Sequence, residues 1–106
     1  MDKLKIVSIN VRGIRDKQKR CSIINWLKQN HYDIVCLQET YITNDIVKEI
    51  EQDFSSFGKI ISSCSDSSHS RGVSIALSCK SQGLEVINVN KDTNARKIAL
   101  NIKDIN

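Results

Sequence analysis

Two hydrophobic periodicities follow one another at the start of the chain. Residues 4–11 alternate in period two, the repeat of a β-strand, and one side of that strand carries Val7, Ile9 and Val11. From residue 16 to residue 30 the apolar positions recur at helical spacing. Asp16 stands where an N-cap is expected, and Asn30 stands where the helix would end. The pattern predicts a strand followed by an amphipathic helix.

The next two segments repeat this order of strand and helix. Residues 33–38 form a short, nearly unbroken apolar run, which is typical of a strand buried on both faces. A second helix is predicted to begin at Thr43 or Asn44, and its buried stripe consists of Ile46, Val47, Ile50 and Phe54. This order of strand and helix predicts a sheet covered by helices, and therefore an α/β fold.

The second half of the chain has the pattern of strands. The serine-rich stretch from residue 62 to residue 70 is predicted to be a loop between two of them. Four segments are predicted to be β: residues 59–63, 72–78, 84–89 and 96–103. Because no repeat, linker or internal boundary interrupts the 106 residues, we expect a single domain or part of one.

Composition narrows the class of protein further. Hydrophobic residues make up 40% and charged residues 26%, so the chain is neither a disordered tail nor a coiled coil. No uncharged apolar run approaches the roughly 20 residues of a spanning helix, and the start lacks the apolar stretch of a signal peptide. We therefore expect an intracellular protein without a membrane partner. The four cysteines form no C-x-x-C pair, which indicates free thiols rather than a zinc or redox motif.

The net charge of +4 is unevenly distributed along the chain. Residues 1–30 carry eight Lys or Arg and two Asp, whereas residues 31–66 carry two Lys and seven acidic residues. The densest basic cluster consists of Arg12, Arg15, Lys17, Lys19 and Arg20. Such a cluster can follow a phosphate backbone, and it can equally be the solvated start of a helix.

Polar residues end the first two predicted strands. Asn10 ends the first strand, and Gln38, Glu39 and Thr40 end the second. Neighbouring strands would bring these groups to one edge of the sheet, where α/β proteins bind ligands. A carboxylate beside an amide suits a hard cation such as Mg²⁺. The alternative is that Asn10 makes a turn and Glu39 caps a helix or lies in solvent.

The order of four segments resembles the start of an endonuclease/exonuclease/phosphatase superfamily domain. The segments are LKIVSINVRGIR from residue 4, INWL from residue 24, DIVCLQET from residue 33 and RGVSIAL from residue 71. The resemblance implies a four-layer α/β sandwich, of which this chain would be the N-terminal half: a mixed β-sheet with helices on its outer face. On this view, residues 1–106 are one partial domain, truncated on its C-terminal side.

The resemblance also implies a second sheet outside this chain, which would cover the apolar positions of the later strands. These positions are Val73, Ile75, Leu77, Ile98, Leu100 and Ile102. Without that cover, the isolated chain is expected to be marginally stable and to self-associate.

The resemblance assigns roles to two residues. Glu39 matches the metal-binding glutamate of the superfamily, and Asn10 matches the asparagine beside the metal and the scissile phosphate. The resemblance implies that the site binds Mg²⁺, with Mn²⁺ as a substitute, and that both residues have a catalytic role. The resemblance also implies that the general base and the charge-stabilising groups of the superfamily belong to the C-terminal half, outside this chain. His31 and His69 are interpreted as surface residues and not as their counterparts. The chain alone is therefore expected to be close to inactive.

Two positions depart from the repair-type members of the superfamily. Arg12 stands in place of an acidic or amide residue, and Tyr41 stands in place of a lysine. The sequences NVRG and QET followed by an aromatic residue look more like endonuclease domains of non-LTR retrotransposons, which nick DNA. This interpretation implies DNA as partner and nuclear localisation. Two alternatives stay open: a non-catalytic nucleic-acid-binding remnant, and a phosphatase of the same superfamily.

Overall fold

The computed structural model describes residues 3–81, 83–92 and 94–104, which form two helices and six strands. In chain order these elements are β1 (Ile6–Asn10), α1 (Lys17–Gln29), β2 (Ile34–Gln38), α2 (Val47–Phe54), β3 (Gly58–Ser63), β4 (Val73–Ser78), β5 (Leu84–Lys91) and β6 (Ile98–Asp104). Every helix and strand predicted from the sequence is present, and the α/β class is confirmed.

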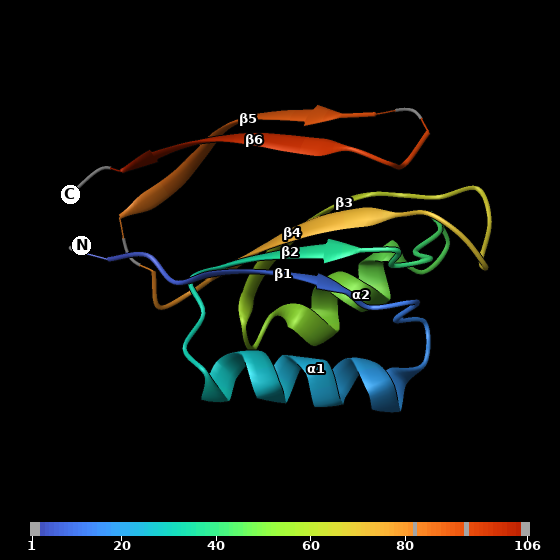
Figure 1. Cartoon of the computed structure of the whole chain (residues 1–106), viewed down its shortest axis with the longest axis horizontal. Coiled ribbons are helices and arrows are strands. Elements are labelled where there is room, and N and C mark those ends of the chain that lie inside the picture. Colours follow the sequence, from blue (N-terminus) through green and yellow to red (C-terminus); the bar gives the residue numbers. More distant parts are fainter. Residues whose placement is uncertain (1–2, 82, 93, 105–106) are drawn as a thin grey trace.

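The strands form two separate sheets. The larger sheet has the order β1-β2-β4-β3, in which β1 and β2 are parallel and the other neighbours are antiparallel. The smaller sheet is the antiparallel hairpin of β5 and β6. Figure 1 shows both helices on one face of the larger sheet and the hairpin on the other. The arrangement is that of a partial α/β sandwich.

The two helices differ in how they begin. The Asp16 carboxylate accepts a hydrogen bond from the Lys19 backbone N–H at 2.9 Å, so the predicted N-cap of α1 is confirmed. Helix α2 begins later than predicted, after a turn at residues 44–46, and its N-cap Ile46 makes no side-chain capping bond. The Thr43 hydroxyl, three residues before this N-cap, instead accepts a hydrogen bond from Arg15 and donates to Asp45.

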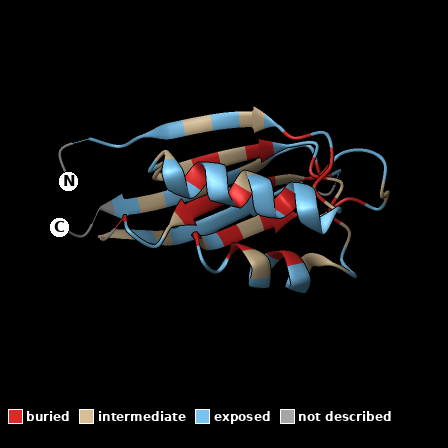
Figure 2. Ribbon diagram, turned by 90° about the horizontal axis from the view of Figure 1, so that it is seen from below, coloured by how far each residue is buried: buried red, intermediate tan, exposed pale blue. Residues whose placement is uncertain are grey.

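The apolar core lies between the larger sheet and the two helices. Five of the core side chains that are at most 1% exposed come from α1, β2 and α2: Leu27, Val35, Leu37, Ile50 and Phe54. In the view from the helix side, buried residues lie on the inner faces of the helices and on the strands behind them (Figure 2). Helix α1 turns a mainly polar and exposed face outward.

The opposite face of the larger sheet is only half covered. Strand β2 was expected to be buried on both faces, but Ile34 and Cys36 are half-buried, in contrast to the buried Val35 and Leu37. The hairpin explains the difference, since two strands do not extend over four. The expectation that the second sheet lies wholly outside the chain is also wrong, because β5 and β6 form its own second sheet.

A β-bulge in β5 preserves the apolar face of the hairpin. Val86 pairs with Ile102 and Asn88 pairs with Asn101, so Ile87 is an extra residue in the ladder. The register resumes with Val89 opposite Leu100. The three-residue spacing from Val86 to Val89 therefore fits one face, and Ile87 is left 60% exposed.

Further expectations concern membranes and thiols. Within the described part of the chain, neither helix has the length and apolar character needed to span a bilayer. All four cysteines are free; Cys21 and Cys79 are exposed, whereas Cys36 and Cys64 are half-buried. Burial raises the pKa of the Cys36 and Cys64 thiols, which keeps them in the neutral form.

Candidate active site

The ends of β1 and β2 bring two polar side chains together. The strands are parallel and in register, with Asn10 opposite Gln38, so the residue after β2 lies beside the end of β1. The Asn10 side-chain amide donates a hydrogen bond to Oε2 of Glu39, and the Tyr41 hydroxyl donates a longer one of 3.5 Å to Oε1. The expected proximity of Asn10 and Glu39 is confirmed; their catalytic roles stay a prediction.

The segments that follow β1 and β2 continue side by side beyond the strands. Gly13 N–H donates to the Glu39 carbonyl at 2.6 Å, and Ile14 N–H donates to the Thr40 carbonyl at 3.0 Å. Glu39 has a φ of +53°, a left-handed conformation that non-glycine residues adopt at a cost and that is common at functional sites. These backbone bonds fix the direction in which the Glu39 side chain leaves the sheet.

Two glycines allow the loops to approach closely. A Cβ on Gly13 would lie 2.5 Å from the Tyr41 ring, and a Cβ on Gly72 would lie 2.5 Å from the Thr40 hydroxyl oxygen. Both glycines also have a φ near +90°, which disfavours other residues. Tyr41 can therefore pack against the backbone of Gly13 while its hydroxyl reaches Glu39.

The neighbours of Glu39 are held by bonds of their own. The Asn10 side-chain oxygen accepts from the Arg12 N–H at 3.2 Å, which leaves its amide group directed at Glu39. The Gln38 amide donates to the Ser8 hydroxyl at 2.7 Å, across the same face of the sheet. Thr40 is completely buried, and its N–H donates to the Gly72 carbonyl at 2.9 Å.

The donor set is that of a hard cation with few protein ligands. Glu39 is exposed and offers carboxylate oxygens at the sheet edge. Among residues 3–81, 83–92 and 94–104, no three His, Cys, Asp or Glu side chains gather as a metal cluster. This composition does not match a closed zinc site, which needs four ligands. It fits Mg²⁺, which binds through one or two carboxylates and retains several waters.

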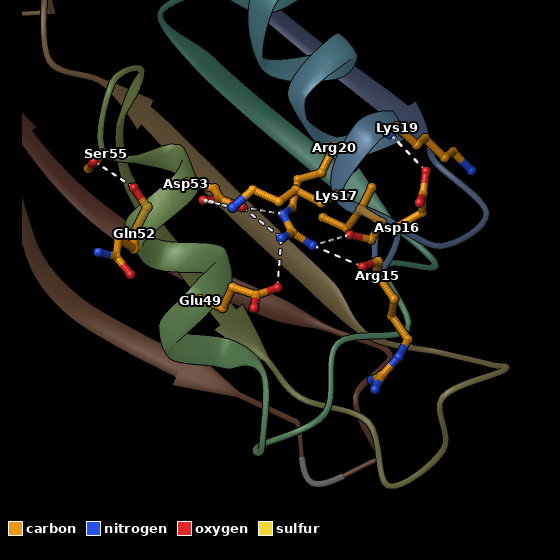
Figure 3. Close-up of polar contacts among 10 residues, drawn as sticks. Arg15, Asp16, Lys17, Lys19, Arg20, Glu49, Gln52, Asp53 and Ser55 are labelled. Atoms are coloured by element: carbon orange, nitrogen blue, oxygen red, sulfur yellow. Dashed lines mark hydrogen bonds and ion pairs between the residues drawn. The ribbon is translucent and has the colours of Figure 1, made fainter.

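The interpretation of Arg20 as a nucleic-acid contact needs correction. Its side chain is 0% exposed and lies between α1 and α2 (Figure 3). The guanidinium forms ion pairs with Asp53 at 2.6 Å and with Glu49 at 2.8 Å, and donates to the carbonyls of Ile14 and Arg15. Arg20 therefore links the two helices and the loop after β1, and no phosphate can reach it.

The other basic residues surround the loop after β1. The Arg15 guanidinium donates to the Tyr41 carbonyl at 3.2 Å, and the Lys19 ammonium donates to the Val11 carbonyl at 2.6 Å. Arg12 is exposed, and Lys17 is 70% exposed although it lies 3.8 Å from Asp53. Arg15 and Lys19 thus brace the loop. Phosphate binding by Arg12, Arg15, Lys17 and Lys19 stays a prediction.

Three residues near this end of the structure were given no functional role from the sequence: Thr43, Asp45 and Arg71. The contact of Arg15 with Thr43 couples the loop after β1 to the segment before α2, and the Thr43 hydrogen bond lowers the pKa of the Asp45 carboxyl. Arg71 has a φ of +64° next to Gly72. In the sequence, Arg71 begins the RGVSIAL segment of the resemblance, which predicts a core strand and assigns no role to the arginine. His31 and His69 are both exposed, as expected.

Comparisons with known proteins agree with this geometry. A model of the endonuclease/exonuclease/phosphatase family matches residues 7–91, which include β2, all of β1 except its first residue, and Glu39. An exodeoxyribonuclease of Bacillus subtilis (strain 168) is 35% identical over 51 residues, which are 48% of this chain and 20% of that protein. The chain therefore spans about a fifth of the length of this curated relative.

Proposed function

The chain belongs to the endonuclease/exonuclease/phosphatase family, and from this premise we propose that it is the metal-binding N-terminal part of a Mg²⁺-dependent phosphodiesterase that cuts DNA. The observation that carries the proposal is the exposed Glu39 carboxylate, held by Asn10 and Tyr41 at the ends of two parallel strands. A carboxylate fixed in this way is prepared to bind a cation without reorganising.

Each residue of the site has a distinct task in this proposal. Glu39 holds the metal, and Asn10 orients the Glu39 carboxylate through its amide and helps to position the phosphate. A metal ion bound at this site would neutralise the negative charge of the phosphate. Mn²⁺ can replace Mg²⁺, because it also accepts oxygen ligands. Gln38 and Thr40 keep the two strand ends in place through Ser8 and Gly72.

We propose that the chain alone is close to inactive. General acid–base catalysis contributes about 10²- to 10⁴-fold, and it needs a titratable group near the reacting atoms. His31 follows α1, whereas the site lies near the start of that helix, and His69 is exposed in the β3–β4 loop. The matched relative is about five times longer than the aligned segment, which is consistent with further catalytic groups outside the aligned part.

DNA is the favoured substrate, ahead of a lipid or inositol phosphate. The matched relative is an exodeoxyribonuclease, and the exposed Arg12 lies two residues from Asn10. We assign the chain to the branch of non-LTR retrotransposon endonucleases on the sequence NVRG and on Tyr41 after Glu39-Thr40. An in-frame reverse-transcriptase region downstream of the endonuclease domain in the gene would support this origin, and a complete gene without one would contradict it.

Metal binding can be tested on the chain itself. Titration with Mn²⁺ should broaden the NMR signals of residues 10, 39 and 41 first, because paramagnetic broadening falls steeply with distance from the ion. Glu39→Gln should abolish this local effect, whereas the control Glu85→Gln, an exposed carboxylate on β5, should leave it intact. Equal broadening around all exposed carboxylates, or none at residue 39, would contradict the metal site.

Activity provides the second arm of the test. Purified residues 1–106 should not nick plasmid DNA with Mg²⁺, whereas the domain extended through its C-terminal part should do so, and Glu39→Ala should abolish that nicking. Nicking by residues 1–106 that is lost in Glu39→Ala would show that the catalytic groups are already present. An extended domain that stays active with Glu39→Ala would remove Glu39 from the mechanism.

A further inference from the structure

A polar cavity of about 230 Å³ opens close to the candidate active site. Three separate segments form its wall: the turn before α2, the β3–β4 loop and the β5–β6 turn. They contribute Asn44, Asp66, Arg71 and Asn94. Its volume is below the roughly 300–1,000 Å³ of sites for drug-sized ligands, so it suits one planar ring system rather than a whole nucleotide.

Backbone bonds fix this cavity to the active-site loop. Tyr41 N–H donates to the Arg71 carbonyl at 2.9 Å, and Gly72 N–H donates to the Ala95 carbonyl at 2.9 Å. Arg71 and Ala95 both have left-handed backbones, with φ of +64° and +57°. A non-glycine residue keeps such a conformation only where its surroundings enforce it. The backbone beside the cavity is therefore held in place by its neighbours, and Arg71 lies one backbone contact from the residue that reaches Glu39.

The chemistry of the wall distinguishes between two possible ligands. The Arg71 guanidinium makes no hydrogen bond or ion pair with any other described residue, so within this part of the chain its donors face the cavity without a partner. The Asp66 carboxylate lines the same cavity, and so do two carboxamides that both donate and accept. A phosphate offers only acceptors and would be repelled by Asp66. The edge of a nucleobase offers donors and acceptors together.

We propose that this cavity binds an unpaired nucleobase of the DNA strand next to the phosphodiester being cut, with guanine as the best match. The Arg71 fork fits the O6 and N7 acceptors of guanine, and the Asp66 carboxylate fits its N1–H and amino donors. The carboxamides of Asn44 and Asn94, which line the same cavity, can donate to or accept from the remaining polar edge. The inference rests on the proposed function, because it takes the chain at Glu39 to be a DNA phosphodiesterase, and it adds a choice of sequence near the cleavage site.

The test is an NMR titration of the 106-residue chain with dGMP, dAMP, dCMP, dTMP and inorganic phosphate, each without metal. dGMP should shift the amide signals of residues 66, 71, 72 and 95 and bind more tightly than the other three nucleotides. One bidentate contact discriminates by about 1–3 kcal/mol, so the preference over dAMP should be roughly 5- to 150-fold. Equal binding of all nucleotides and of phosphate would overturn the proposal, and so would no binding at millimolar concentrations.

Two substitutions separate base recognition from attraction of charge. Arg71→Lys keeps the charge but loses the fork, so it should remove the dGMP preference. Asp66→Asn should also remove that preference, whereas an anion site would bind phosphate more tightly after this change. The matched control is Arg96→Ala, an exposed arginine that lines a different cavity and should leave the preference unchanged. An equal loss in Arg96→Ala would overturn base recognition.

The result is independent of the metal test. If dGMP shows no preference while Mn²⁺ still broadens residue 39, the cavity proposal fails and the proposed function stands. If dGMP binds in the cavity while Mn²⁺ ignores Glu39, the proposed function fails instead.

Discussion

The two faces of the larger sheet are buried to different extents. On the helix side, Val35 and Leu37 of β2 are at most 1% exposed beneath α1 and α2. On the hairpin side, Ile34 and Cys36 of the same strand are half-buried. At the edge of the hairpin side, Ile6 of β1 is 58% exposed. Adjacent residues of β2 thus face two different layers: the helices cover their side fully, and the hairpin covers its side only in part.

This difference bears on both proposals. The candidate site lies at an end of the sheet where loops from both faces meet, since the β5–β6 turn bonds to Gly72 and the loop after β2 bonds to the same residue. The helix side supplies the rigid support of β1 and β2, which hold Asn10 and Glu39. The hairpin side supplies one wall of the polar cavity through Asn94. We therefore expect Glu39 to be better ordered than the cavity in the isolated chain.

The largest effect should come from comparing two adjacent isoleucines of β3. Ile60 is 4% exposed on the helix side, and Ile61 is half-buried on the hairpin side. Ile60→Ala should lower the free energy of unfolding by about 3 kcal/mol, because removal of a buried isoleucine leaves a cavity, and Ile61→Ala should lower it by about half as much. Urea unfolding of both variants measures the difference. Equal losses would show that the hairpin closes its side as fully as the helices do.

A smaller effect is expected within the helix layer, where Arg20 and Lys17 both approach Asp53. Arg20→Lys should lower the free energy of unfolding by about 2 kcal/mol, since a lysine cannot serve both carboxylates and the buried carbonyls. Lys17→Ala, at a 70% exposed side chain, should change it by less than about 0.5 kcal/mol. A comparable loss in the two variants would mean that charge alone, and not the guanidinium geometry, stabilises this layer.

The same contrast explains what the sequence could predict. The apolar patterns of residues 16–30 and 33–38 reflect packing between the helices and the larger sheet, and both partners belong to this chain. The positions of the helix layer and of β2 could therefore be predicted correctly. Arg20 was interpreted wrongly because a charge run along the sequence does not reveal that one residue turns inward to meet Asp53, 33 residues away. The bulge at Ile87 and the left-handed backbone of Arg71 were not predicted, since both depend on partners in other strands and loops.

The proximity of Asn10 and Glu39 could be predicted, because parallel strands that are close in the chain place their ends at one edge. The cavity of Arg71 could not be predicted in this way. Its wall joins segments from residue 44 to residue 94, and no local pattern encodes that meeting.

The smallest effect on stability should come from a substitution at the β5 bulge, which also tests how exposed the apolar residues of the hairpin are. Ile87 is 60% exposed, whereas the adjacent Val86 is half-buried on the face that pairs with Ile102. Ile87→Thr should change the free energy of unfolding by less than about 0.5 kcal/mol, as for other surface substitutions. It should nevertheless reduce self-association in sedimentation velocity and the binding of a hydrophobic dye, because an exposed apolar side chain on a short hairpin favours association. Val86→Thr is the matched control; it should lower stability more than Ile87→Thr, since threonine would bring a hydroxyl to the half-buried face. If Ile87→Thr is the more destabilising of the two, Ile87 packs in solution, and the hairpin is in another register than the bulge gives it.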